Sequence, residues 1–175
     1  MNKFKLLLTF VLLGTLHSCC WDGNCDDSDD IVIVEPPFES AYEPIVLDRE
    51  TFEQSVQLLP PKPIVNSGKI YVLNNLLFVN EKHGGFHVFL NDDPSNPIPI
   101  NFIEVFGSSD ISIRNGVYYI NQAVDLIAIV YNTRSSELTI SKRIKDVFPV
   151  LLSPEGYYPY DLDQNSVVVG WKLKS

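Results

Sequence analysis

Cysteine is scarce in this sequence, and its placement excludes several kinds of site. The three cysteines, Cys19, Cys20 and Cys25, all lie near the N-terminus, and the rest of the chain has none. A disulfide-stapled domain and a zinc site made of cysteines are therefore excluded there. In an oxidising compartment, Cys20 and Cys25 could pair with each other or stay free.

Motifs of the common enzyme classes are also missing. The sequence contains no nucleotide-binding glycine loop, nucleophile elbow, zinc-protease helix or Cys-x-x-Cys pair. Ser108, Ser109 and Asp110 are adjacent, but no histidine is placed by the sequence to activate a serine. We therefore predict a protein that is not an enzyme and has no cofactor.

Positive charge is low. The chain has 13 lysines and arginines against 22 aspartates and glutamates, a net charge of −9. Loss of Lys3 and Lys5 with an N-terminal signal would change this charge from −9 to −11. Because phosphate binding requires a basic face, nucleic acid is excluded as a partner. The same charge argues against docking on anionic lipid.

Long hydrophobic runs are absent except for a short one near the N-terminus. Leu6 to Leu13 is apolar apart from Thr9, and Lys3 and Lys5 precede it. A membrane-spanning helix needs about 20 apolar residues, so this run is too short. A charged start, a short apolar core and small residues predict a signal peptide over residues 1–18.

The four residues that follow the apolar core suggest lipid attachment. Leu16-His17-Ser18-Cys19 resembles the lipobox of bacterial lipoproteins. The resemblance implies cleavage before Cys19 and acylation of that residue. Acyl chains contribute about 0.8 kcal/mol per buried CH₂ and anchor a protein stably when there are several. The alternative is a secreted protein that is cut near Ser18 and leaves Cys19 unmodified.

Residues 19–47 are predicted to form an acidic, proline-rich tether. Asp26, Asp27, Asp29 and Asp30 lie close together, and Pro36, Pro37 and Pro44 follow. Such composition favours a solvated linker. An acidic run after the lipidated cysteine resembles a surface-export signal of some Gram-negative bacteria, and a plain spacer is the alternative. We expect an outer-membrane lipoprotein that is either periplasmic or surface-exposed.

A short helix and a linker are predicted over residues 48–67. Asp48 is a suitable N-cap, and Glu50 lies in the first turn, where the helix dipole favours a carboxylate. Phe52 and Val56 would form an apolar stripe, and Pro60-Pro61 would stop the helix. The prediction is a helix over residues 49–58.

From residue 68 onward the pattern is β, and it repeats with a period of about 40 residues. The turn at Asn74-Asn75 separates the first two strands, and Asn115-Gly116 is the strongest hairpin signal in the chain. The strands predicted for the first unit (68–108) are 69–73, 76–80, 86–90 and 98–106. Those of the second unit (109–149) are 110–114, 117–121, 126–130 and 138–144. Residues 117–121 align with 76–80 at an offset of 41, and 126–130 with 86–90 at an offset of 40.

A partial third unit is predicted over residues 157–175, with strands at 157–162 and 166–171. The fold class is therefore all-β, with two consecutive four-stranded antiparallel meanders, a partial third and one short N-terminal helix. Meanders of this length are typical of propeller blades. Because two and a fraction units cannot close a ring, the two sheets should pack face to face or against the helix. Open strand edges would remain, which could support self-association.

Residues 68–149 resemble the LVIVD-repeat proteins, which are propeller-like bacterial envelope proteins. The residues that carry the resemblance are Gly68-Lys69-Ile70-Tyr71-Val72, Leu77-Phe78-Val79-Asn80-Glu81, Gly85-Phe86-His87-Val88, Asp92-Asp93-Pro94-Ser95-Asn96-Pro97, Asp110-Ile111-Ser112-Ile113, Asp125-Leu126-Ile127-Ala128-Ile129 and Val147-Phe148-Pro149. The resemblance implies a structural repeat and an envelope location. The LVIVD motif itself is present only as Leu126 to Val130, without its closing aspartate.

Two groups of residues have the types found in metal sites. Glu81, His83 and His87 could hold zinc, although the resembling family carries a histidine at the position of His87 as part of its repeat. Asp161-x-Asp163-x-Asn165 matches the start of a calcium loop, but the twelfth position is Lys172 instead of glutamate. We therefore predict no metal site and interpret both groups as turn and strand residues.

Aromatic residues near the C-terminus are the best candidates for ligand contacts. They are Tyr157, Tyr158, Tyr160 and Trp171. Exposed rings could stack on a glycan, whereas burial between the sheets is the alternative. We expect an envelope interaction module with a protein or glycan partner. The other possibilities are a glycan-binding or glycan-processing surface subunit, which would use this patch or the loops 91–97 and 132–136, and a truncated fragment of a longer propeller protein.

Overall fold

A computed structural model describes residues 40–175 of the chain. The predicted signal peptide, Cys19 and the tether up to residue 39 lie outside the described residues. No helix among the described residues is long and apolar enough to cross a membrane.

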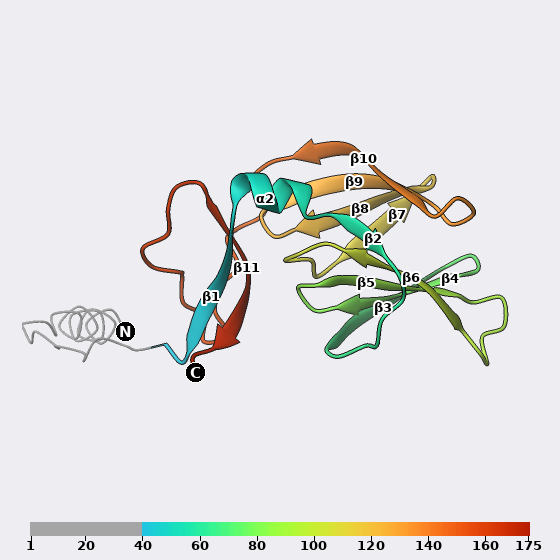
Figure 1. Cartoon of the computed structure of the whole chain (residues 1–175), viewed down its shortest axis with the longest axis horizontal. Coiled ribbons are helices and arrows are strands. Elements are labelled where there is room, and N and C mark those ends of the chain that lie inside the picture. The colour runs from blue at the N-terminus through green and yellow to red at the C-terminus, as the bar shows by residue number, and fades with distance from the viewer. Residues whose placement is uncertain (1–39) are drawn as a thin grey trace, which may run out of the picture. The chain divides into compact units, whose positions relative to one another are not determined.

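The two predicted meanders form two antiparallel sheets, which confirms the all-β fold class (Figure 1). The first sheet contains β3 (Ser67–Leu73), β4 (Leu76–Glu81), β5 (Gly85–Leu90) and β6 (Ile98–Glu104). The second sheet contains β7 (Ile111–Arg114), β8 (Val117–Gln122), β9 (Asp125–Asn132) and β10 (Glu137–Ile144). A further short strand, β2 (Gln57–Leu59), adds to the first sheet beside β6. Neither sheet closes on itself, so β2, β3, β7 and β10 are edge strands.

The hairpin turns lie where the sequence places them. Asn115 and Gly116 have φ angles of 51° and 76°, as a two-residue turn with positive φ at both positions requires. Asn74 has a φ of 52°, and the pair Leu73–Leu76 closes its hairpin. Short polar side chains and glycine adopt this conformation at low cost, so the turn chemistry fixes the register of both hairpins.

The main core lies between the two sheets, as face-to-face packing requires. The rings of Phe78 on β4 and Tyr118 on β8 are 5.5 Å apart. Ten other buried side chains complete this core: Leu76, Phe86, Val88, Ile103, Val105, Ile111, Ile120, Ile127, Ile129 and Tyr131. The Tyr131 hydroxyl donates a hydrogen bond of 2.7 Å to the side-chain oxygen of Asn101 on the first sheet. Apolar burial therefore holds the sheets together, and this hydrogen bond adds a polar link between them.

The N-terminal part of the described chain differs from the prediction. The tether was expected to extend to residue 47, but β1 spans Tyr42–Asp48. Helix α2 spans Arg49–Gln54, and the Asp48 carboxylate accepts the Thr51 N–H at 3.0 Å, which confirms the N-cap. The helix is shorter than expected because residues 57–59 extend and pair with β6. Pro60 and Pro61 therefore follow β2 and do not terminate the helix.

The partial third unit is also corrected. The last strand, β11 (Ser166–Leu173), pairs with β1 and not with residues 157–162, which form no strand. Pro159 lacks an N–H donor for a ladder, and Asp161 has a φ of 54°, which interrupts an extended chain. The first and last strands of the described chain therefore form a separate two-stranded ribbon.

A second core attaches this ribbon to the sheets. The Phe52 ring of α2 is fully buried there with Val167 and Val169 of β11. Ala123 and Val124, in the turn between β8 and β9, complete the cluster. The ribbon and the helix thus pack against one end of the second sheet.

Buried charge links the same elements. The Asp125 carboxylate, at the start of β9, is fully buried. Its Oδ2 atom lies 2.6 Å from the Arg49 guanidinium and 2.7 Å from that of Arg143, and its Oδ1 atom accepts the Asp146 N–H at 3.1 Å. Both guanidinium groups also lie near the Phe52 ring, 5.4 and 5.6 Å from its centroid. One carboxylate therefore holds α2 to the second sheet.

The neighbouring Glu53 should make stability depend on acid pH. Hydrogen bonds from Lys145 and then Arg49, at 2.5 and 2.6 Å, lower the pKa of Glu53 from 4.5 to about 2. Because the folded-state pKa is depressed, this stabilisation is present above pH 4.5 and is lost as the pH falls towards 2. Glu53→Gln should therefore lower the melting temperature at about pH 7 and have little effect near pH 2. Melting curves at both pH values test this, and an equal effect at both would contradict it.

Candidate binding face

The residues first considered for zinc do not form a metal site. His87 is buried, and its Nε2 atom lies 2.9 Å from the Glu81 carboxylate. That carboxylate also accepts the N–H groups of Val65 and Asn66 at 3.0 and 2.5 Å. Desolvation opposes the ionisation of Glu81, but these hydrogen bonds outweigh it and lower its pKa. The carboxylate thus anchors the chain that leads into β3.

His83 lies in the turn between β4 and β5 with a φ of 59°, as a turn residue. Burial, and then the nearby Lys82, lower its pKa, which favours the neutral imidazole. No cluster of three or more His, Cys, Asp or Glu residues suited to a metal occurs within residues 40–175. Asp161, Asp163 and Asn165 are exposed, and the Asp163 carbonyl accepts the Ser166 N–H in the turn before β11.

The C-terminal aromatic residues lie outside the core between the sheets. Tyr158 and Tyr160 are 64% and 77% exposed, so burial of these two rings is ruled out. Trp171 and Tyr157 are half-buried, and the Trp171 indole N–H donates to the Leu151 carbonyl at 3.1 Å. The indole therefore positions the 148–152 segment, while the two exposed tyrosines remain available to a glycan.

The structure exposes an apolar surface that none of the sequence motifs above indicates. It is the face of the second sheet that points away from the first sheet, and we call it the outer face. Its apolar part is formed by six residues of β8, β9 and β10: Val117, Tyr119, Leu126, Ala128, Val130 and Ile144. Arg114 of β7 and Lys142 of β10 pair with Val117 and Ala128, so two cations lie on the same face. Tyr119, Val130 and Ile144 are 38%, 43% and 48% exposed, and none of the six is charged. Contiguous apolar surface of this kind on a folded chain indicates an interaction site.

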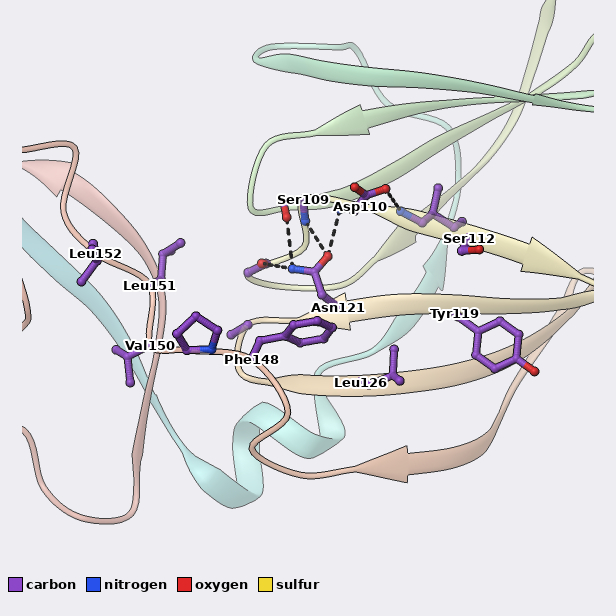
Figure 2. A pocket seen from close by; sticks show the side chains of 14 residues that line it. Ser109, Asp110, Ser112, Tyr119, Asn121, Leu126, Phe148, Val150, Leu151 and Leu152 are labelled. Atoms are coloured by element: carbon purple, nitrogen blue, oxygen red, sulfur yellow. Dashed lines mark hydrogen bonds between the residues drawn. The ribbon is translucent and has the colours of Figure 1, made fainter. Parts of the chain in front are cut away.

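A groove of about 560 Å³ runs along one end of the outer face. Its walls are the sheet, through Tyr119 and Leu126, and the apolar segment 148–152 (Figure 2). This segment is held in place because the N–H groups of Val147 and Phe148 both donate to the Val124 carbonyl, at 2.8 and 2.9 Å. The groove extends the outer face, and its lining is mostly apolar, as in sites that bind apolar groups.

The polar end of the groove is occupied by internal hydrogen bonds. The Asn121 side-chain oxygen accepts the N–H groups of Ser109 and Asp110 at 3.0 and 2.9 Å, as Figure 2 shows. The Asp110 carboxylate is bound by Lys69 and Tyr71 of β3, and these hydrogen bonds, that of Lys69 first, lower its pKa. Asp110 therefore stays ionised near neutral pH and is unsuited to act as a base. These contacts shape the polar end of the groove.

No protein-family model, curated protein or solved structure matches the chain. The resemblance to LVIVD-repeat proteins accordingly remains a prediction. One signal of the outer face is present in the sequence. The strand Val117-Tyr118-Tyr119-Ile120 has apolar side chains on both of its sides. A strand that is apolar on both faces is usually covered on both faces.

The opposite face of the first sheet is covered by the chain itself over β4, β5 and β6, whereas Ile70 and Val72 on β3 are each 64% exposed there. Phe102, His87 and Val79 point away from the core between the sheets, yet all are at least nine-tenths buried. The Lys62 ammonium lies 3.6 Å from the centroid of the Phe102 ring, and the Glu81 hydrogen bonds hold residues 65 and 66 nearby. This face of the first sheet is therefore closed beside residues 62–66 and open along β3.

Proposed function

We propose that this protein is a lipid-anchored cell-envelope protein whose β domain is an interaction module that acts by binding, not by catalysis. The outer face and its groove are the observation that carries the proposal. They combine exposed apolar residues with polar groups that are already hydrogen-bonded to one another. Such a surface can bury apolar area against a partner protein, and it presents no activated nucleophile or base.

The N-terminal sequence supports the location of this module. The signal peptide and the lipobox at Cys19 favour anchorage in the outer membrane of a Gram-negative bacterium, on its periplasmic or its outer side. The acidic tether would hold the domain away from the bilayer, and the acidic chain disfavours nucleic acid as a partner. A glycan at Tyr158 and Tyr160 is the second candidate, since both rings are exposed.

Lipid attachment predicts a specific labelling pattern. Cells that express the full chain and are fed an alkyne-bearing palmitate analogue should incorporate the label into the wild-type protein. Cys19→Ala should abolish the label, because this residue is the predicted acylation site. Cys20→Ala is the matched control and should be labelled like the wild type. Equal labelling of the Cys19→Ala variant and the wild type would refute the anchor.

Binding at the outer face predicts a position-specific cross-link. The photo-reactive residue p-benzoylphenylalanine, placed at Tyr119 of the full chain in cells, should give a protein adduct of defined mass after irradiation. The control is the same residue at Val72, which is 64% exposed on β3 of the first sheet. It should give little adduct. If position 119 yields no protein adduct, the outer face is not an interaction site and the proposed function fails.

A further inference from the structure

We infer that a second pocket, where the chain passes from the first sheet to the second, binds a small oxyanion: inorganic phosphate or a phosphate monoester. This pocket contains none of the six apolar residues of the outer face, and the inference does not depend on the proposed function. Three features carry it: buried polar atoms without hydrogen-bond partners, two lysine ammonium groups and a lining without carboxylates.

The pocket has a volume of about 240 Å³ and is lined by three segments of the chain. The first is the start of β3, and the second is the end of β4 with the turn that follows it. The third is the link between β6 and β7, which joins the two sheets. The seven lining residues are Gly68, Lys69, Asn80, Lys82, His83, Ser108 and Ser109.

Backbone hydrogen bonds hold these segments together. The His83 N–H donates to the Ser108 carbonyl at 3.0 Å, and the Gly107 N–H donates to the His83 carbonyl at 2.8 Å. The Lys82 N–H donates to the Asn66 carbonyl at 2.9 Å, which ties the same turn to the chain just before β3. The frame of the pocket is therefore formed before a ligand binds, and such preorganisation lowers the cost of binding.

Two buried polar atoms of the lining residues have no hydrogen-bond partner. Within residues 40–175, the buried side-chain atoms without a partner are Ser108 Oγ, His83 Nδ1 and Gln122 Oε1. The first two belong to residues of this one pocket. Ser108 is fully buried, so solvent does not compensate its hydroxyl. Buried polar groups in native proteins are nearly always hydrogen-bonded, and a bound ligand would satisfy both atoms.

Charge selects an anion as this ligand. The Lys69 ammonium pairs with Asp110, whereas the exposed Lys82 ammonium has no ion pair with any described residue. None of the seven lining residues is an aspartate or glutamate, so the lining itself contains no group that repels an anion. A phosphate group has several oxygens that can accept from ammonium, hydroxyl and imidazole N–H donors together.

The acidity of the whole chain does not oppose this site. A single phosphate group needs only a local cluster of donors, whereas nucleic acid requires a broad basic face. The net charge of −9 therefore excludes the polyanion and leaves the small anion possible. Lysine has a flexible four-carbon stem, so the side chains of Lys69 and Lys82 can move to admit the ligand and close over it.

The same geometry favours binding over catalysis at this pocket. Because Ser108 Oγ and His83 Nδ1 both lack a partner, no hydrogen bond joins the hydroxyl to that imidazole nitrogen. A serine nucleophile is activated by such a contact with a base. The Ser108 hydroxyl is therefore suited to donate to an anion and is not activated for attack.

Isothermal titration calorimetry on the full chain, purified in detergent, tests the site. The probes are inorganic phosphate and glycerol 3-phosphate, titrated at constant ionic strength, and the tighter binder distinguishes a free ion from a monoester. Lys82→Gln and Ser108→Ala should each raise Kd roughly tenfold or more, because each removes a donor to a charged group. Lys174→Gln is the matched control, since Lys174 is exposed and lies outside the pocket, and its Kd should equal that of the wild type.

Melting temperatures separate a ligand contact from a structural role of Ser108. Without phosphate, Ser108→Ala should melt at or above the wild-type temperature, because it removes an unpartnered hydroxyl. Added phosphate should raise the melting temperature of the wild type well above that of this variant.

Three results would overturn the inference. They are no saturable binding of either probe to the wild type, equal stabilisation by chloride at the same ionic strength, and wild-type affinity in both Lys82→Gln and Ser108→Ala. The last result would show that only a water molecule satisfies the buried atoms. If Ser108→Ala melts early, Lys82→Gln decides, since an exposed side chain without an ion pair to a described residue contributes little to folding.

Discussion

Asp125→Asn should lower the free energy of unfolding by about 3–5 kcal/mol, because it removes the anion from a buried ion network. The Asp125 carboxylate is fully buried and neutralises Arg49 and Arg143, whose side chains are 16% and 13% exposed. The asparagine keeps the size of the side chain but leaves two guanidinium groups with less negative charge nearby. The cost arises from these uncompensated cations and not from lost volume.

Urea denaturation followed by circular dichroism measures this loss. The matched control is Asp146→Asn, because the Asp146 side chain is 78% exposed and its carboxylate lies 3.6 Å from Arg49. An exposed pair of this kind contributes about 0–1 kcal/mol. If Asp125→Asn costs no more than the control, the network does not hold α2 to the second sheet.

Gly85→Ala should also destabilise the protein strongly, by about 3 kcal/mol or more. Gly85 begins β5 with a φ of 142°, a conformation that residues with a side chain rarely adopt. A Cβ atom there would lie 2.1 Å from the Ile103 carbonyl oxygen and 3.0 Å from the Val105 nitrogen. Backbone atoms cannot turn aside as a flexible side chain can, so β5 and β6 would have to separate.

Gly116→Ala separates the backbone strain of a positive φ from the close approach of neighbouring backbone atoms. Gly116 also has a positive φ, 76°, but a Cβ atom there would meet nothing within 4 Å. Its substitution should therefore cost only the backbone strain of about 1–2 kcal/mol. Thermal unfolding of both variants provides the comparison. If the two variants have the same melting temperature, the close approach at Gly85 carries no energetic weight.

The local signals in the sequence predict the two sheets well. Asn74, Asn115 and Gly116 mark turns because their side chains tolerate positive φ, and alternating apolar residues mark the strands between the turns. Phe52 is buried on the predicted helix, where the local spacing of apolar residues places it. These features depend on residues that are close in sequence, so a pattern within a short window contains the information.

Pairings between residues that are far apart in the sequence cannot be predicted from a pattern within a short window. Residues 42–48 contain Pro44 and look like a linker, and they form β1 only because β11 lies alongside. The outer face was missed for a related reason. Val117-Tyr118-Tyr119-Ile120 is apolar on both sides, and periodicity does not tell which side faces the first sheet. The ion pairs of Asp125 reach Arg49, far away in sequence, which no local pattern indicates.

The pairing of β1 with β11 also sets the order in which the domain can be completed. Tyr42 pairs with Leu173, at nearly opposite ends of the described chain. A chain that is synthesised from its N-terminus leaves β1 without its partner until the last strand has been delivered, whereas both meanders can form earlier from neighbouring residues. Strand β1, through which the chain enters the domain, is therefore the last to be fixed. Firm attachment of residues 42–48 to the domain then depends on delivery of residues 166–173.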